Sequence, residues 1–137
     1  MASVKVSDLF KDLNDWQDFY AFFHDYKLFG DLPDIFGRDE SLDINSLHHI
    51  HLANTPEVQE KWAKTPRQFC RKTEIKHPEH DYWLIYAYDD FREEYLLLTI
   101  TGPSAHRREK WDPYLRDILT TIVEPWTLGR VSYPEED

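Results

Sequence analysis

The strongest constraint on the fold is a pair of β-favouring segments separated by a short polar turn. Residues 82–88 read Tyr-Trp-Leu-Ile-Tyr-Ala-Tyr, and residues 95–101 read Tyr-Leu-Leu-Leu-Thr-Ile-Thr. Aromatic and β-branched residues favour strands, and the Asp-Asp-Phe-Arg sequence at 89–92 favours a turn. Gly102-Pro103 ends the second segment. The sequence therefore predicts a central antiparallel β-hairpin.

Three segments have the features of helices. In residues 7–29, apolar side chains recur at steps of three and four, with Ser7 as a possible N-cap and Gly30 as a possible C-cap. Residues 55–64 begin with Thr-Pro-Glu, an order that suits the first turn of a helix. A third helix is expected from residue 112 or 113 to residue 123, where one side is apolar.

The remaining segments complete an α+β domain. Short strands are expected at residues 4–6, 48–52 and 67–73, and Pro33 and Gly37 predict a loop over residues 32–39. We expect a small, mainly antiparallel sheet with the helices packed on one face. The length of 137 residues fits one domain, and the acidic tail at residues 131–137 is expected to be flexible.

Charge and composition narrow the class of protein. The net charge of −10 argues against a generally basic protein that coats nucleic acid. One cysteine excludes an intrachain disulfide framework, and no apolar run could span a bilayer. We therefore expect a cytoplasmic protein without a membrane partner. Two basic islands interrupt the acidic chain: Lys61, Lys64, Arg67, Arg71, Lys72 and Lys76, then Arg107, Arg108, Lys110 and Arg116. They either share one face or are ordinary solvated surfaces.

Seven histidines provide candidates for proton transfer. On a strand, His49 and His51 share one face, and His106 precedes two arginines. A zinc site at His49 and His51 would need a distant further ligand, and no HExxH-like spacing supports it. The same residue types, with arginine and aspartate, suit metal-free RNA cleavage, in which a base activates the ribose 2′-OH and an acid protonates the leaving oxygen.

Two longer motifs resemble a known family. Leu-Pro-Asp-Ile-Phe-Gly-Arg-Asp at residues 32–39 and His-Ile-His-Leu-Ala-Asn at residues 49–54 are similar to the YafO family of bacterial type II toxins. The similarity runs from about residue 26 to about residue 110. It implies a single RelE-like toxin domain over residues 1–137, with no cofactor. It further implies an mRNA interferase that cuts mRNA on the ribosome and is blocked by a cognate antitoxin.

The resemblance also implies site residues. It gives His106 as general acid, His51 or Asp81 as base or orienting group, and Arg71, on the expected strand at 67–73, as the cation facing the phosphate. Further RNA contacts are expected from Arg67, Lys72, Arg107 and Arg108, with His49 and Arg38 as possible additions.

Other interpretations of these residues stay open. His49 and His51 could stabilise the loop that carries Arg38, Asp81 could pair with an arginine at a strand end, and Arg38 could brace Asp39. The acidic charge favours an alternative function, a catalytically inactive family member that binds a basic protein. A metal-dependent hydrolase built on the histidines is the third reading.

Overall fold

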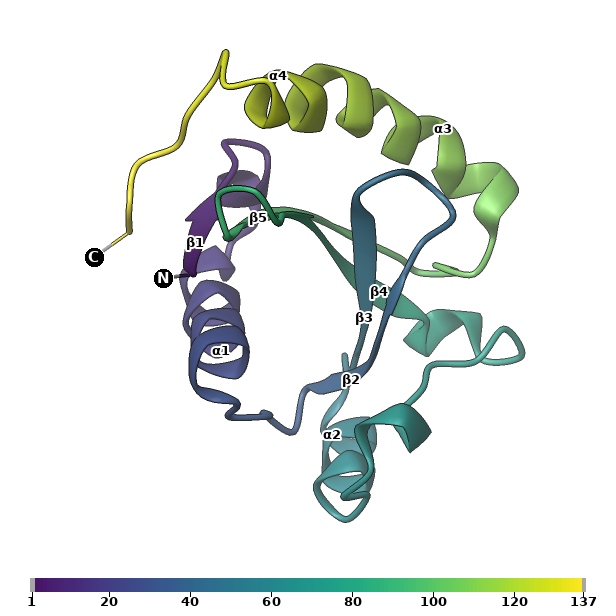
Figure 1. Cartoon of the computed structure of the whole chain (residues 1–137). Coiled ribbons are helices and arrows are strands. Elements are labelled where there is room, and N and C mark those ends of the chain that lie inside the picture. The colour runs from purple at the N-terminus through teal and green to yellow at the C-terminus, as the bar shows by residue number, and fades with distance from the viewer. Residues whose placement is uncertain (1, 137) are drawn as a thin grey trace.

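The computed structural model describes residues 2–136, which form a five-stranded sheet with the order β1-β5-β4-β3-β2 (Figure 1). The first strand pairs in parallel with β5, and the other neighbours are antiparallel. The strands are β1 (Ser3–Val6), β2 (Phe36–Ser41), β3 (Leu47–Leu52), β4 (Tyr82–Asp89) and β5 (Glu94–Thr101). The β4–β5 hairpin lies near the centre of the sheet, and β2 is an edge strand.

Helices connect and cover these strands. They are α1 (Trp16–Phe29), α2 (Pro56–Ala63), α3 (Arg108–Ile118) and α4 (Glu124–Thr127), with 3₁₀ turns at Phe10–Asp12, Gln68–Cys70 and Pro78–His80 and a π-helical turn at Leu119–Val123. Helix α1 ends at Gly30, whose φ of 74° suits glycine. Helix α2 begins where the Thr55 hydroxyl accepts a hydrogen bond from the Val58 N–H at 3.3 Å.

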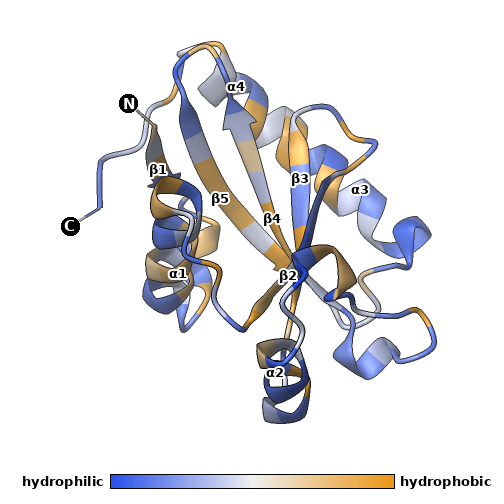
Figure 2. Cartoon of the chain, turned by 60° about the horizontal axis from the view of Figure 1, so that its bottom comes forward, coloured by the Kyte–Doolittle hydropathy of each residue, from blue (hydrophilic) through white to orange (hydrophobic). Residues whose placement is uncertain are grey.

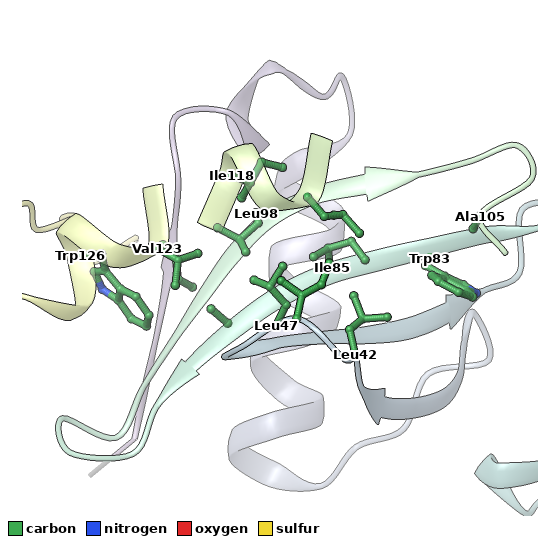
Figure 3. Packing of buried hydrophobic residues seen from close by; sticks show 13 residues of the cluster. Leu42, Leu47, Trp83, Ile85, Leu98, Ala105, Ile118, Val123 and Trp126 are labelled. Carbon is green, nitrogen blue, oxygen red and sulfur yellow. The ribbon is translucent and has the colours of Figure 1, made fainter. Parts of the chain in front are cut away.

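Helices cover both faces of the sheet, which corrects the expectation of one covered face. On one face, α1 contributes Phe23 to a cluster with Leu84. On the other, α3 and α4 contribute Ile118 and Trp126 to a cluster with Ile85 (Figures 1 and 3). The reason lies in the strand sequences, because successive side chains point to opposite faces and most of those in β4 and β5 are apolar. Figure 2 shows apolar colour along the central strands, whereas α2 and α3 are largely hydrophilic.

The α+β class, the mainly antiparallel sheet and the central hairpin are confirmed. The expected strand at 67–73 is wrong, because this segment forms the 3₁₀ turn Gln68–Cys70 and extended loops. The helix expected over 7–29 begins only at Trp16, and the Ser7 hydroxyl instead accepts the Phe10 N–H at 3.2 Å. Strand β2 begins inside the expected loop at 32–39, and the third helix begins at Arg108.

Near the C-terminus, Tyr133 packs against the cluster below α3, and Glu136 lies 3.0 Å from the Lys11 ammonium. The flexibility of residues 131–137 stays a prediction. Within residues 2–136, no helix is both long enough and apolar enough to cross a membrane.

Candidate active site

The site is built around a buried carboxylate–imidazole pair. Asp81 precedes β4 and is fully buried, and His106 follows β5 and precedes α3. The Asp81 carboxylate lies 2.8 Å from the His106 Nδ1 and accepts a hydrogen bond from the His106 backbone N–H, also at 2.8 Å. It accepts a further hydrogen bond, at 2.7 Å, from the Thr73 hydroxyl. Both carboxylate oxygens are therefore occupied, and Asp81 is placed to orient His106.

This pairing determines which nitrogen of His106 is available. Because an ionised carboxylate only accepts hydrogen bonds, Nδ1 carries the proton that is donated to Asp81. The free nitrogen is then Nε2, which accepts a proton when the ring is neutral and donates one when the ring is charged. The His106 side chain is 26% exposed, so a substrate can reach it. A carboxylate that fixes the tautomer and stabilises the protonated ring is the arrangement that acid–base histidines use.

The second histidine, His51, is held differently. Its Nδ1 accepts a hydrogen bond from the Thr73 backbone N–H at 2.8 Å. That nitrogen therefore has no proton, and the single proton of the neutral ring is on Nε2. Burial, followed by the charges of His49 and His106, lowers the pKa of His51 to about 3. At neutral pH this ring is an uncharged hydrogen-bond donor, suited to holding a substrate oxygen rather than accepting its proton.

Two further rings complete the cluster. His49 lies on the same face of β3, and its Nδ1 is 2.9 Å from the Glu40 carbonyl, so its Nε2 carries the free lone pair. Burial is the main cause that lowers the pKa of His49 to about 4. The Trp83 ring centroid lies 4.3 Å from His49 and 4.7 Å from His106, so the two imidazoles lie within about 9 Å of each other.

Several cations surround these rings. The charges of Arg38 and Lys72 contribute to the lowered pKa of His51, after burial and the neighbouring histidines, and Arg108 contributes in the same way at His49. Arg107 helps to line an open hollow of about 410 Å³ beside Asp81 and His106. Arg67 is exposed at the start of the 3₁₀ turn Gln68–Cys70.

Arg71 is placed apart from this cluster. Its side chain donates hydrogen bonds to the carbonyls of Thr65 at 2.8 Å and of Pro33 and Phe36 at 3.1 Å, and the residue is only 5% exposed. The guanidinium therefore ties the loop after α2 to the start of β2 and the segment before it, and these contacts occupy its Nε and one terminal nitrogen. The prediction from the sequence placed Arg71 on a strand at residues 67–73 that faces the phosphate, and this strand is not formed.

The polar residues of the motif at residues 32–39 make separate contacts. Arg38 and Asp39 do not brace each other. Arg38 stacks on Phe69 and lies 3.5 Å from Glu40, whereas Asp39 lies 2.7 Å from the Lys27 ammonium and accepts the Tyr86 hydroxyl on the α1 side. Asp81, too, pairs with a histidine rather than with an arginine.

Sequence reasoning missed two members of the site. Thr73 joins His51 to Asp81, but it lies 22 residues from the first and 8 from the second, and no local pattern identifies it. Trp83 had a usable signal, because it follows Asp81 by two positions on the central strand. Within residues 2–136, no group of three or more His, Cys, Asp or Glu side chains is placed to hold a metal ion.

An oriented Asp–His pair lies beside two neutral imidazoles on an α+β framework. This small protein therefore has the groups that acid–base chemistry requires. Comparison with known families matches residues 24–128 to "Toxin YafO, type II toxin-antitoxin system". The chain belongs to this YafO toxin family. It is 35% identical over 97 residues to the mRNA interferase toxin YafO of Escherichia coli (strain K12), a match that covers 64% of this chain and 67% of that protein. No solved structure matches the chain, and the RelE-like resemblance stays a prediction.

Proposed function

We propose that this chain is the toxin of a type II toxin–antitoxin pair and cleaves mRNA on the ribosome by metal-independent acid–base chemistry. The observation that carries the proposal is the contact of the His106 Nδ1 with the buried Asp81 carboxylate at 2.8 Å. Membership of the YafO family and the similarity to the mRNA interferase toxin YafO of Escherichia coli support it further. A ribosomal substrate also implies a cytoplasmic location.

The proposed reaction is an internal transfer at one phosphodiester. The ribose 2′-oxygen loses its proton and attacks the adjacent phosphorus, and the bond to the 5′-oxygen breaks. The products are a 2′,3′-cyclic phosphate and a free 5′-hydroxyl, so atoms and charge balance without a water molecule. In this scheme the His49 Nε2 accepts the 2′-proton, and protonated His106 gives its Nε2 proton to the leaving oxygen.

The other groups stabilise and position. His51 donates its Nε2–H to a phosphoryl oxygen, and Arg38, in place of Arg71, supplies the positive charge that the transition state requires. Asp81 is a positioning residue, because its carboxylate accepts hydrogen bonds from Thr73 and His106 and acts through the imidazole. Thr73 is a second positioning residue, since it fixes both Asp81 and the His51 tautomer.

Primer extension on an mRNA, with and without translating ribosomes, tests cleavage and ribosome dependence together. We expect a cut with wild-type protein on the translated message and a loss of that cut with His106→Gln. The scheme also requires a 5′-hydroxyl on the downstream fragment. Attack by water at a metal centre would leave a 5′-phosphate instead, so the end group distinguishes the two mechanisms. A zinc-selective chelator that spares ribosomal Mg²⁺ should not change the rate.

An absence of cleavage under both conditions, with folded protein, would leave the inactive binding module as the better explanation.

The family also implies an antitoxin partner. Because the chain carries a net charge of −10, we propose that the toxin-binding segment of the antitoxin is basic. Co-expression of such a partner should relieve the growth arrest that expression of the toxin causes. Raised salt should weaken the purified complex of toxin and antitoxin.

A further inference from the structure

We propose that Phe69 and Arg38 form a stacking platform for a nucleobase of single-stranded RNA at the β2 edge of the active-site face. This inference rests on the proposed function, since it names how the same site holds its substrate. Phe69 is 60% exposed, so much of its ring is open to solvent. The Arg38 guanidinium carbon lies 3.7 Å from the centre of that ring. Two flat, stacked groups therefore stand at the surface.

The platform is held rigidly. The Arg38 Nε donates a hydrogen bond to the Phe69 carbonyl at 2.9 Å, and the Arg38 backbone N–H donates to the Arg71 carbonyl at 2.7 Å. Gln68, which precedes Phe69, donates to the Gly37 carbonyl at 2.8 Å. Hydrogen bonds of Arg38 and Gln68 thus hold the backbone around the exposed ring. A preformed surface loses little conformational entropy when a ligand binds.

The position of the platform connects it to the histidine cluster. Strand β2 pairs with β3, with Asp39 opposite Ile50, so Arg38 is adjacent to His51 in the sheet. The pairing is irregular between Phe36 and Asp39, and both of these residues contact the α1 side, whereas Arg38 points away from it. The influence of the Arg38 charge on the pKa of His51 agrees with this placement.

A nucleobase is the ligand that best fits these groups. Aromatic rings and arginine planes both stack on bases, and this stacking tolerates any base because each has a π-face. The Arg38 side chain contacts the Phe69 carbonyl and the Glu40 carboxylate through Nε. Its terminal nitrogens can therefore bind the phosphate that follows the stacked base. This is the reacting phosphate of the proposed function, so the stacked base lies directly beside the bond that is cut.

The test measures binding of a fluorescein-labelled 2′-O-methyl RNA of about ten nucleotides, a length within the range of single-strand sites. The methyl group removes the nucleophile, so the RNA binds without being cut. A second oligonucleotide has the same phosphates and abasic sugars. Phe69→Leu keeps an apolar side chain but removes the ring, and Phe69→Trp restores a ring. Phe91→Leu is the matched control, because Phe91 is 93% exposed in the β4–β5 turn.

We expect Phe69→Leu to weaken binding of the base-bearing RNA by about 5- to 100-fold and to leave abasic binding unchanged. Phe69→Trp should bind at least as tightly as wild type, and Phe91→Leu should match wild type. The proposal is overturned if Phe69→Leu behaves like Phe91→Leu, if it weakens both RNAs equally, or if wild type does not prefer the base-bearing RNA.

Cleavage of translated mRNA by the same variants separates this inference from the proposed function. Wild-type cleavage with an unaffected Phe69→Leu variant would overturn the platform and leave the activity standing. No cleavage by wild type, together with base-dependent binding through Phe69, would overturn the activity and leave the platform standing. An increase in KM with unchanged kcat in Phe69→Leu supports both.

Discussion

The burial of two neutral histidines makes a quantitative prediction about stability at acid pH. His49 and His51 are 9% and 4% exposed, and burial is the first cause that lowers their pKa values to about 4 and about 3. In the unfolded chain both rings return to the ordinary histidine pKa of about 6.5. The unfolded chain therefore binds more protons than the folded protein between these pH values.

The sign follows from this difference in bound protons. A histidine with a lowered folded pKa contributes its full stabilisation above about pH 6.5 and loses it as pH falls toward the folded value. From pH 7 to pH 5, each ring should remove about 2 kcal/mol from the free energy of unfolding. The size depends little on whether the folded pKa is 3 or 4, because both values lie below pH 5. Together the two rings account for about 4 kcal/mol.

Urea unfolding followed by tryptophan fluorescence at pH 7 and pH 5 measures this effect. Glutamine is a suitable replacement because it does not titrate. Its oxygen can accept the Thr73 N–H at position 51, and its nitrogen can donate to the Glu40 carbonyl at position 49. Each of His49→Gln and His51→Gln should reduce the pH-dependent loss of stability by about 2 kcal/mol relative to wild type.

Comparison of variant with wild type cancels the titration of groups that both proteins share. His77→Gln is a control for the removal of an imidazole, since His77 is 59% exposed at the surface. If His49→Gln and His51→Gln lose as much stability as wild type between pH 7 and pH 5, the two rings are not held neutral by burial. The assignment of His51 as an uncharged hydrogen-bond donor would then be wrong.

Three further predictions test the framework of the site. Thr73→Val removes the hydroxyl that binds Asp81, so kcat for RNA cleavage should fall about tenfold or more with KM unchanged, and Thr73→Ser should restore it. Arg71→Met should lower the free energy of unfolding by about 3 kcal/mol in a urea titration while the folded fraction cleaves normally; a stable but inactive variant would return Arg71 to the catalytic site. Gly37→Ala should cost about 1–3 kcal/mol by the same measurement, because a Cβ there would overlap the Arg71 carbonyl and lie 2.8 Å from the Trp62 ring; wild-type stability would contradict this packing.

The local patterns of the sequence were sufficient for most of the secondary structure. The hairpin of β4 and β5 and the capped start of α2 follow from residue type and spacing over a few positions. The same strand sequences also carry a signal about the faces of the sheet. Residues 82–88 are apolar on both sides of the strand, and such a strand is buried on both faces. Helices on both faces were therefore already indicated.

The sequence also indicated two histidines of the site, His51 within the motif at residues 49–54 and His106 through the resemblance to the toxin family. It could not assign their protonation states, because these depend on partners far along the chain. The Thr73 N–H that fixes the His51 tautomer is 22 residues away, and Asp81 is 25 residues from His106.

The sequence alone predicts most of the helices and strands, although not β2, and supplies the kinds of side chain available, because periodicity and caps act between near neighbours. The tertiary structure decided which of those side chains meet. It assigned Arg71 to three backbone carbonyls, placed Asp81 behind His106 and brought Phe69 to the surface beside Arg38. The physical reason is that hydrogen bonds and burial act between groups that folding brings together, whatever their separation in the chain.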